Sequence, residues 1–342
     1  MKKNITIHDL AKVLEIDSST VSRALSNSPR VGVKTKSRVK AMAKEMGYQR
    51  NLLASNLRTN KTMTIGVVVP FISRHFFSEA IDGIEQIASN NGYRVIISQS
   101  RDDFEKEKQI VEGMFMNRVD GLLISPTQST RNGEHLNSFI QSKIPIVLFD
   151  RFYENSNLSK VVLADRKAAY ILTEHLIKQD KRNIFHLTGN LESVMYKERF
   201  AGYKNALLDN GIEFNEDYVK SINLYADDAV EAVKELLDNK NNLPDAIVCV
   251  NDVTALAIIK YITENTDYRI PQDIAVAGFS NEPASAIITP GLTTIDQHPF
   301  EIGKTSTKML FEFIKDNFSG QLSSKTVVIQ PDLLVRESTD IK

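Results

Sequence analysis

Cysteine and long apolar runs are scarce in this 342-residue chain, and their scarcity excludes several classes of protein. The single cysteine, Cys249, can form neither a disulfide framework nor a paired-cysteine zinc site, and it suits a reducing cytosol. Apolar runs such as residues 65–69 are far shorter than the roughly 20 residues of a membrane-spanning helix. The first residues lead into no apolar segment typical of a signal peptide. The sequence therefore predicts a cytoplasmic protein that does not cross a membrane.

Motifs for catalysis and for metal or cofactor binding are also missing. The chain has no phosphate-binding glycine loop, no dinucleotide-binding glycine pattern and no paired-histidine zinc motif. Its six histidines lack the spacing of metal ligands. Residues 278–282 imitate the turn that holds a hydrolase nucleophile, but Glu282 replaces the last glycine of that turn. An enzyme is the rival class, and we expect no catalytic residue, no metal and no cofactor.

Charge is divided unevenly along the chain. Residues 1–61 hold 13 lysines and arginines and four acidic residues, whereas the remainder holds 29 basic and 39 acidic residues. The net charge of −1 for the whole chain hides this division. A basic segment joined to an acidic body is expected where only the segment faces the phosphates of a nucleic acid. A solvated basic face without such a partner is the alternative.

The basic segment has the pattern of three short helices. Thr6 is a suitable N-cap for the first, and apolar residues recur with helical spacing after it. A tight turn at residues 15–17 leads to a second helix, capped by Asp17 or Ser18, and the third ends at Gly47. Two short helices joined by a tight turn form a helix-turn-helix, whose second helix enters the major groove of DNA. A small protein-interaction bundle is the alternative.

The remainder of the chain alternates short apolar runs with amphipathic segments. Continuous runs of valine, isoleucine and leucine between helices indicate parallel sheets with helices on both faces. Two such series follow one another, which indicates two lobes with a cleft between them. Predicted strands cover 64–70, 93–98, 121–125, 145–150, 183–187, 219–222, 246–250 and 274–277, and predicted helices cover 77–91, 104–117, 166–178, 197–210, 227–239, 253–264 and 299–318.

Ligands of open α/β sheets bind beyond the carboxyl ends of the strands. The loops at these ends carry aromatic rings together with amide, carboxylate and guanidinium groups. This mixture suits a polyhydroxylated ligand, because hydroxyls both donate and accept hydrogen bonds and sugar C–H faces pack on rings. The candidate residues are Phe71, His75, Phe76, Asp150, Arg151, Arg199, Asn251, Asp252, Ser280, Asn281 and Glu282.

Four segments of the first 58 residues resemble the LacI/GalR repressor family: 6–11 (TIHDLA), 18–26 (SSTVSRALS), 45–48 (EMGY) and 51–58 (NLLASNLR). The similarity extends almost to the C-terminus. It implies a helix-turn-helix domain followed by a two-lobed body like that of periplasmic binding proteins, with parallel sheets tied by three crossovers. It further implies a sequence-specific transcriptional regulator, a repressor by type, that binds a pseudo-palindromic double-stranded operator as a homodimer.

The resemblance also implies individual DNA contacts. Ser18, Ser19 and Arg23 align with the residues that read base edges, and an arginine on guanine is the commonest contact of this kind. The exposed-cation role of most surface arginines is the alternative for Arg23. Thr20, Ser22 and Asn27 are expected to position the protein on phosphates, and Thr6 is a further expected DNA contact.

Residues 51–58 resemble the family's hinge helix, which is too short to be stable alone and is expected to form on DNA. Leu57 aligns with a leucine that wedges into the minor groove, and Asn51, Ala54 and Arg58 accompany it. An ordinary apolar contact with the body is the alternative for Leu57. Many relatives have proline at the position of Arg50 and arginine at that of Ser55, so the hinge geometry differs here.

In the body, the resemblance favours Arg199 and the pair Asn251–Asp252 as effector ligands, with Phe76 and Phe77 as aromatic lining. The alternatives are a place in the lobe core for Phe77, a helix cap for Asp252 and a surface cation for Arg199. Ser280 stands where relatives usually have aspartate, so we expect a ligand different from theirs. A sugar or sugar derivative is favoured, and a nucleobase or other metabolite is the alternative. A sugar-binding protein with no DNA role is a third possibility.

The expected organisation places the helix-turn-helix in residues 1–49, a hinge in 50–61 and an effector-binding and dimerisation domain in 62–342. Lobe 1 is expected to comprise 62–163 and 293–322, and lobe 2 to comprise 164–292 and 323–342. Effector binding would close or rotate the lobes and change the ability of paired hinges to bind DNA.

Overall fold

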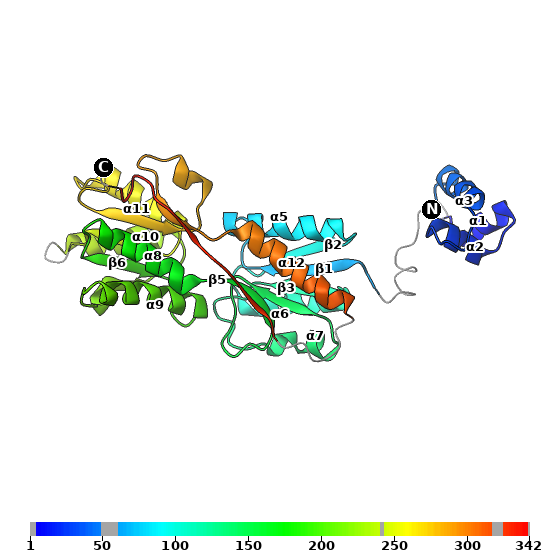
Figure 1. The fold of residues 1–342 in the computed structure, drawn as a ribbon, viewed down its shortest axis with the longest axis horizontal. Helices are drawn as coiled ribbons and strands as arrows, with labels where there is room; N and C mark the ends of the chain where they lie inside the picture. The colour runs from blue at the N-terminus through cyan, green and yellow to red at the C-terminus, as the bar shows by residue number, and fades with distance from the viewer. Residues whose placement is uncertain (1–4, 49–60, 240–242, 317–323, 341–342) are drawn as a thin grey trace. The chain divides into compact units, whose positions relative to one another are not determined.

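The computed structural model describes residues 5–48, 61–239, 243–316 and 324–340. The chain forms two compact units, Met1–Thr62 and Met63–Lys342, whose folds can be followed in Figure 1. The predicted hinge contacts Asn51, Ala54, Leu57 and Arg58 lie outside the described residues.

Residues 5–48 of the N-terminal unit form three helices, as the apolar spacing predicts: α1 (Ile7–Leu14), α2 (Ser18–Leu25) and α3 (Val33–Glu45). A capping box starts α1, because the Thr6 hydroxyl accepts from the Asp9 amide while the Asp9 side chain accepts from the Thr6 amide. Asp17 caps α2, with its carboxylate 2.7 Å from the Ser19 amide. The three helices enclose one apolar core, formed by Leu10, Leu14, Val21, Ala24, Val31, Val39 and Ala43.

The C-terminal unit is built from two lobes, each with a six-stranded sheet. The strand order is β11-β5-β4-β3-β1-β2 in lobe 1 and β12-β10-β9-β8-β6-β7 in lobe 2, and every pairing is parallel except that of β12 with β10. In lobe 1 the strands are β1 (Thr64–Val69), β2 (Arg94–Gln99), β3 (Gly121–Ile124), β4 (Ile146–Phe149), β5 (Ser159–Leu163) and β11 (Thr326–Ile329). In lobe 2 they are β6 (Ile184–Thr188), β7 (Val219–Ser221), β8 (Ala246–Cys249), β9 (Ala275–Phe279), β10 (Thr293–Asp296) and β12 (Asp332–Leu334).

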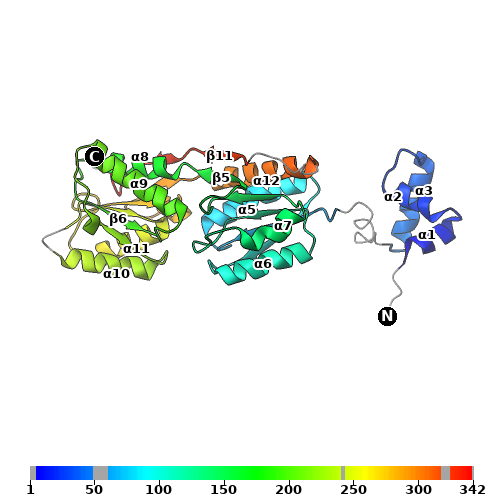
Figure 2. The same ribbon diagram turned by 90° about the horizontal axis from the view of Figure 1, so that it is seen from below.

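Helices cover both faces of each sheet. In lobe 1, α5 (His75–Asn90) and α12 (Pro299–Lys315) share one apolar core with the sheet, and α6 (Phe104–Met116) and α7 (Asn137–Gln141) share another. Figure 2 shows the corresponding layers of lobe 2, with α8 and α9 on one face and α10 and α11 on the other. The lobe 2 helices are α8 (Asp165–Lys178), α9 (Val194–Asp209), α10 (Ala226–Asp238) and α11 (Asp252–Asn265).

Glycines let α5 and α12 pack with their backbones in contact. A Cβ added at Gly83 would collide with the carbonyl oxygen of Phe300, and one added at Gly303 would collide with that of Ala80. Only residues without a side chain allow so close an approach. This tight pair of helices fixes the start of α12 beside α5 on lobe 1.

The chain passes between the lobes three times, after β5, after β10 and between β11 and β12. The topology corrects the predicted lobe boundaries in two places. Residues 293–296, expected in lobe 1, form β10 beside β9 in lobe 2, and residues 326–329, expected in lobe 2, form β11 beside β5 in lobe 1. Both strands are short and lie at crossovers, where strand pairing decides the lobe and the local apolar pattern does not.

Among the helices in the described parts of the chain, none combines the length and the apolar character needed to cross a membrane.

Candidate functional site

A cleft of about 800 Å³ lies between the lobes at the carboxyl ends of their strands. Residues that follow β1, β3 and β4 line it from lobe 1, and residues that follow β6, β8 and β9 line it from lobe 2. Strand ends meet at one edge of a parallel sheet, so the loops of both sheets converge here. The predicted ligand residues that line the cleft are Phe71, Phe76, Asp150, Arg151, Arg199, Asn251, Ser280 and Glu282.

His75, Asn281 and Asp252 do not line this cleft, and Asn281 lines the same separate cavity as His75. His75 begins α5 and lines a separate cavity of about 260 Å³ together with His298 and Asp296, while the next residue, Phe76, lines the main cleft. Successive residues of a helix point about 100° apart, which separates these two neighbours. The prediction that His75 faces the main cleft is therefore wrong.

Asp252 is fully buried and organises the loops behind the cleft. Its carboxylate accepts hydrogen bonds from the Thr294 hydroxyl at 2.6 Å, the Ser285 hydroxyl at 2.7 Å and the Glu282 amide at 2.8 Å. These donors satisfy both oxygens, so the predicted role of Asp252 as an effector ligand is contradicted. The helix cap proposed as its alternative role belongs to Asn251, whose side-chain oxygen accepts from the Thr254 amide at 2.9 Å.

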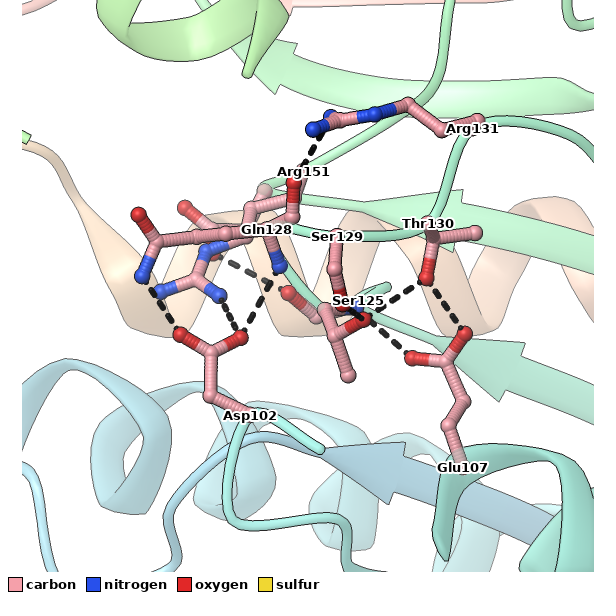
Figure 3. Close-up of polar contacts among 10 residues, drawn as sticks. Asp102, Glu107, Ser125, Gln128, Ser129, Thr130, Arg131 and Arg151 are labelled. Carbon is pink, nitrogen blue, oxygen red and sulfur yellow. Dashed lines mark hydrogen bonds and ion pairs between the residues drawn. The ribbon is translucent and has the colours of Figure 1, made fainter. Parts of the chain in front are cut away.

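Two carboxylates hold the Arg151 guanidinium on the lobe 1 side of the cleft. Its Nη1 donates to Asp102 Oδ1 at 2.8 Å (Figure 3). Its Nε lies 3.8 Å from Asp150 Oδ2. Burial raises the pKa of the Asp150 carboxyl, although the charges of Arg151 and Arg199 and a hydrogen bond from Ser125 oppose that shift. The site therefore presents to a ligand the donors of a buried guanidinium that two carboxylates orient.

Arg199 supplies the corresponding cation from α9 in lobe 2. It is 5% exposed, so the surface-cation alternative is excluded. Its Nε donates to Asp165 Oδ1 at 2.7 Å, Nη1 donates to the Val250 carbonyl at 3.3 Å, and the group lies 3.8 Å from the centre of the Phe279 ring. Burial raises the pKa of Asp165 to about 6, with the charge of Arg199 acting in the opposite direction.

Phe77 lines the cleft and also belongs to the apolar core of lobe 1, where its ring meets that of Phe76 edge to face at 5.1 Å. Its two predicted roles are therefore compatible. Phe76 and Phe77 together form an apolar wall next to the charged groups of the cleft.

Several polar residues that line the cleft were not among the predicted ligand residues. Most of them follow the carboxyl ends of other strands, where ligands of open α/β sheets are also expected to bind. Tyr196 lies instead on the first turns of α9, one helical turn before Arg199. These residues are Asp102, Gln128, Asn190, Tyr196, Asn223 and Gln297.

The lining combines aromatic rings with donors and acceptors in both lobes, and it can bind a small molecule that carries several hydrogen-bonding groups. Within the described ranges, no group of three or more histidine, cysteine or acidic side chains is arranged to hold a metal ion.

The N-terminal unit presents the predicted contact residues on α2 and the loop after it. Ser19, Arg23 and Asn27 are exposed, and Ser18, Thr20 and Ser22 are half-buried. Asn27 has a positive φ of 55°, and its side-chain oxygen accepts from Lys40 Nζ of α3 at 2.7 Å. Lys34, Arg38 and Lys44 add further charge along α3, so α2 and α3 together present a basic surface.

Comparisons with known proteins match both units. A family model described as bacterial regulatory proteins of the lacI family matches residues 6–51, and one described as periplasmic binding proteins and sugar binding domain of the LacI family matches residues 62–337. The HTH-type transcriptional repressor PurR of Aliivibrio fischeri is 31% identical over 97% of this chain and 98% of its own length. Catabolite control protein A of Priestia megaterium is 29% identical over 98% of this chain and 99% of its own length.

Among solved structures, the lac repressor dimer bound to operator and the anti-inducer ONPF is 25% identical, with a TM-score of 0.87. That match covers 98% of this chain and 99% of the other.

Proposed function

The chain belongs to the LacI family of bacterial regulatory proteins, and from this premise we propose that it is a transcriptional repressor controlled by a small-molecule effector. One observation carries the proposal: a basic helix-turn-helix unit and a two-lobed body with a polar, ring-lined cleft occur in one chain. The relatives named above are regulators and not enzymes, and we propose no catalytic activity for this chain.

In the proposed complex with DNA, side chains of α2 contact the base edges. Arg23 is exposed on the last turn of α2, where a long guanidinium can reach guanine O6 and N7 in the major groove. Ser18 and Ser19 make weaker base contacts, Thr20, Ser22 and Asn27 position the unit on phosphates, and Thr6 is a further DNA contact. A homodimer places two such helices in successive major grooves, about 34–36 Å apart, over a pseudo-palindromic operator.

We propose a sugar or sugar derivative as the effector. The family description names a sugar-binding domain, and the cleft offers Phe71 and Phe76 for a sugar face together with Arg151, Arg199 and Asn251 for hydroxyls. A nucleobase is the alternative effector, because the same rings can stack on a base. The effector acts by binding one arrangement of the lobes more tightly than another, which shifts the population of DNA-competent dimers.

Two measurements test this function. Fluorescence anisotropy with random duplex DNA should show binding that weakens steeply as salt rises, because each phosphate contact releases counterions. A thermal-shift screen of monosaccharides, disaccharides, sugar phosphates and nucleobases should find a stabilising ligand, and the class that stabilises decides between the effectors. Absence of salt-sensitive affinity for any duplex would remove the regulatory function.

A further inference from the structure

Contacts that join the two lobes occur beside the cleft as well as in the crossovers. Arg131 of lobe 1 pairs with Glu192 of lobe 2, and Lys197 Nζ of lobe 2 lies 2.6 Å from Glu154 Oε1 of lobe 1. The guanidinium of Arg74, which lines the cleft, donates to the Leu224 carbonyl at 3.2 Å. These side chains hold the lobes in the arrangement that the structure shows.

Arg131 belongs to residues 127–135, a segment of lobe 1 between β3 and α7. Hydrogen bonds to a buried carboxylate hold this segment in place. Glu107 of α6 is fully buried, and its carboxylate accepts from the Thr127 amide at 2.7 Å and the Thr130 hydroxyl at 2.8 Å. His135 Nε2 lies 3.1 Å from the same carboxylate. Figure 3 shows Glu107 beneath Thr130, with Arg131 directed away from it. These contacts therefore fix the position of the backbone that carries Arg131.

The same segment is also connected to the cleft. The Gln128 amide donates to Asp102 Oδ1 at 2.9 Å, and this oxygen also accepts from Arg151 Nη1 at 2.8 Å. The Gln128 side chain donates to the other Asp102 oxygen, and the Gln128 carbonyl accepts from Arg131 Nη1 at 3.1 Å. A continuous polar chain thus leads from Arg151, which faces the cleft, through Asp102 and Gln128 to Arg131 (Figure 3). Arg131 in turn pairs with Glu192 on the opposite lobe.

We propose that residues 127–135 form a latch that couples occupancy of the cleft to the arrangement of the lobes. A ligand that takes hydrogen bonds from Arg151 or Gln128 redistributes those that Asp102 receives, and Gln128 transmits the change to Arg131. The Arg131–Glu192 pair then sets how strongly the lobes stay together. This inference rests on the proposed function, since it assigns the residues that carry the effector signal, but the geometry of the latch can be tested without an effector.

An exposed ion pair contributes little free energy, yet a two-state equilibrium responds to small differences. The Arg131 and Glu192 side chains are 48% and 69% exposed. Breaking the pair should change the ratio of the two lobe arrangements by about two- to fivefold, the effect expected of a single exposed pair.

The test uses the full-length protein with spin labels on Ser138→Cys in α7 and Asn205→Cys in α9, which are exposed positions on opposite lobes. Cys249 is buried, and excess unlabelled protein suppresses distances between subunits. Arg131→Glu and Glu192→Arg should each shift the distance distribution, because each brings like charges together. The double variant Arg131→Glu/Glu192→Arg should restore the original distribution.

The matched control is Arg166–Glu198, an exposed pair with both members in lobe 2 and an Nη2–Oε1 distance of 2.9 Å. Arg166→Glu and Glu198→Arg should leave the distribution unchanged. The latch is refuted if the Arg131 and Glu192 single variants keep the original distances, or if the double variant fails to restore them. DNA anisotropy on the same samples separates the two proposals, because loss of the latch leaves salt-sensitive DNA binding in place.

A separate substitution tests the connection between the cleft and the Arg131–Glu192 pair. Asp102→Asn keeps an oxygen for the Gln128 amide and Arg151, but it removes the acceptor for the Gln128 side chain and the negative charge beside Arg151. It should shift the distances in the same direction as Arg131→Glu although Arg131 and Glu192 are intact. An unchanged distribution would confine the latch to the ion pair and overturn the polar chain.

Discussion

Arg199 and Asp165 show how a single buried pair joins stability to ligand binding. The guanidinium is enclosed by Phe279, the Asp165 carboxylate and the Val250 carbonyl, so it is oriented before any ligand arrives. A donor held in this way loses little rotamer freedom on binding. The sequence indicated Arg199 through its resemblance to a family, whereas Asp165, which orients it, could not be recognised because it starts α8 in another part of the chain.

Replacing Arg199 tests both roles. Arg199→Ala should abolish the thermal shift produced by any ligand found in the screen, and it should lower the free energy of unfolding by about 3 kcal/mol because Asp165 is left buried without its partner. Urea denaturation at neutral pH measures the second effect. The double variant Arg199→Ala/Asp165→Ala should recover much of the stability without recovering the shift. A ligand-induced shift that survives Arg199→Ala would remove this residue from the site.

His186 in β6 should make the protein sensitive to acid. It is 3% exposed, its ring stacks on Tyr203 at 4.8 Å, and burial, assisted by the charge of Arg199, lowers its pKa from 6.5 to about 3. A histidine with a depressed pKa stabilises the fold fully above pH 6.5, and that contribution is lost as the pH falls toward 3.

At pH 5 the depressed pKa of His186 should lower the free energy of unfolding by about 2 kcal/mol. His186→Phe keeps the stacked ring but cannot bind a proton, so this pH-dependent decrease should disappear. The variant should therefore gain stability relative to the parent as the pH falls from 7 to 5. Urea titrations at both pH values measure this gain. An equal difference between variant and parent at pH 7 and pH 5 would show that His186 does not titrate in this range.

At the scale of single elements, the pair α5 and α12 depends on two glycines with no room for a side chain. Gly303→Ala places a methyl group against the Ala80 carbonyl and should lower the free energy of unfolding by about 1–3 kcal/mol. Gly113→Ala in α6 is the control, because no atom lies within 4 Å of the added Cβ. That change should raise stability by up to about 1 kcal/mol, since alanine favours a helix over glycine. Thermal unfolding of both variants decides whether packing or propensity dominates.

Most elements could be predicted from apolar spacing, because buried strands and amphipathic helices leave strong local patterns. The sequence left the cap of α2 open between Asp17 and Ser18, and the structure places it at Asp17, whereas the end of α3 before Gly47 agrees with the predicted glycine stop. The direction of side chains at strand ends could not be predicted in this way. Asn251 lines the cleft while its neighbour Asp252 points into the protein, and only the partners of each residue reveal which of them faces a ligand.

At the scale of the molecule, charge separates the two tasks of the chain. The basic surface of α2 and α3 should provide the general attraction to DNA, and Arg23 should provide base discrimination. Arg23→Ala should therefore reduce the preference for duplexes selected from a random library by about 1–3 kcal/mol per guanine contact, with little effect on random duplex binding. Competition anisotropy at fixed salt measures this preference. Equal losses on selected and random duplexes would assign Arg23 to phosphate contact.

Lys44 on α3 provides a comparison with Arg23, because it is expected to contact phosphates and not bases. Lys44→Ala should weaken binding to selected and random duplexes alike and lower the slope of log affinity against log salt by about one, as expected of one phosphate contact. The slope is measured by repeating the anisotropy titrations over a series of salt concentrations. A change in sequence preference would instead place Lys44 at a base.

The last fifty residues of the chain contribute to both lobes in turn. Lobe 2 receives β10, lobe 1 then receives α12 and β11, and lobe 2 finally receives β12. During synthesis, neither lobe can complete its sheet until this final stretch has left the ribosome. A premature stop codon after residue 292 would leave both lobes incomplete, and such a truncated product would expose unpaired strand edges on each half at once.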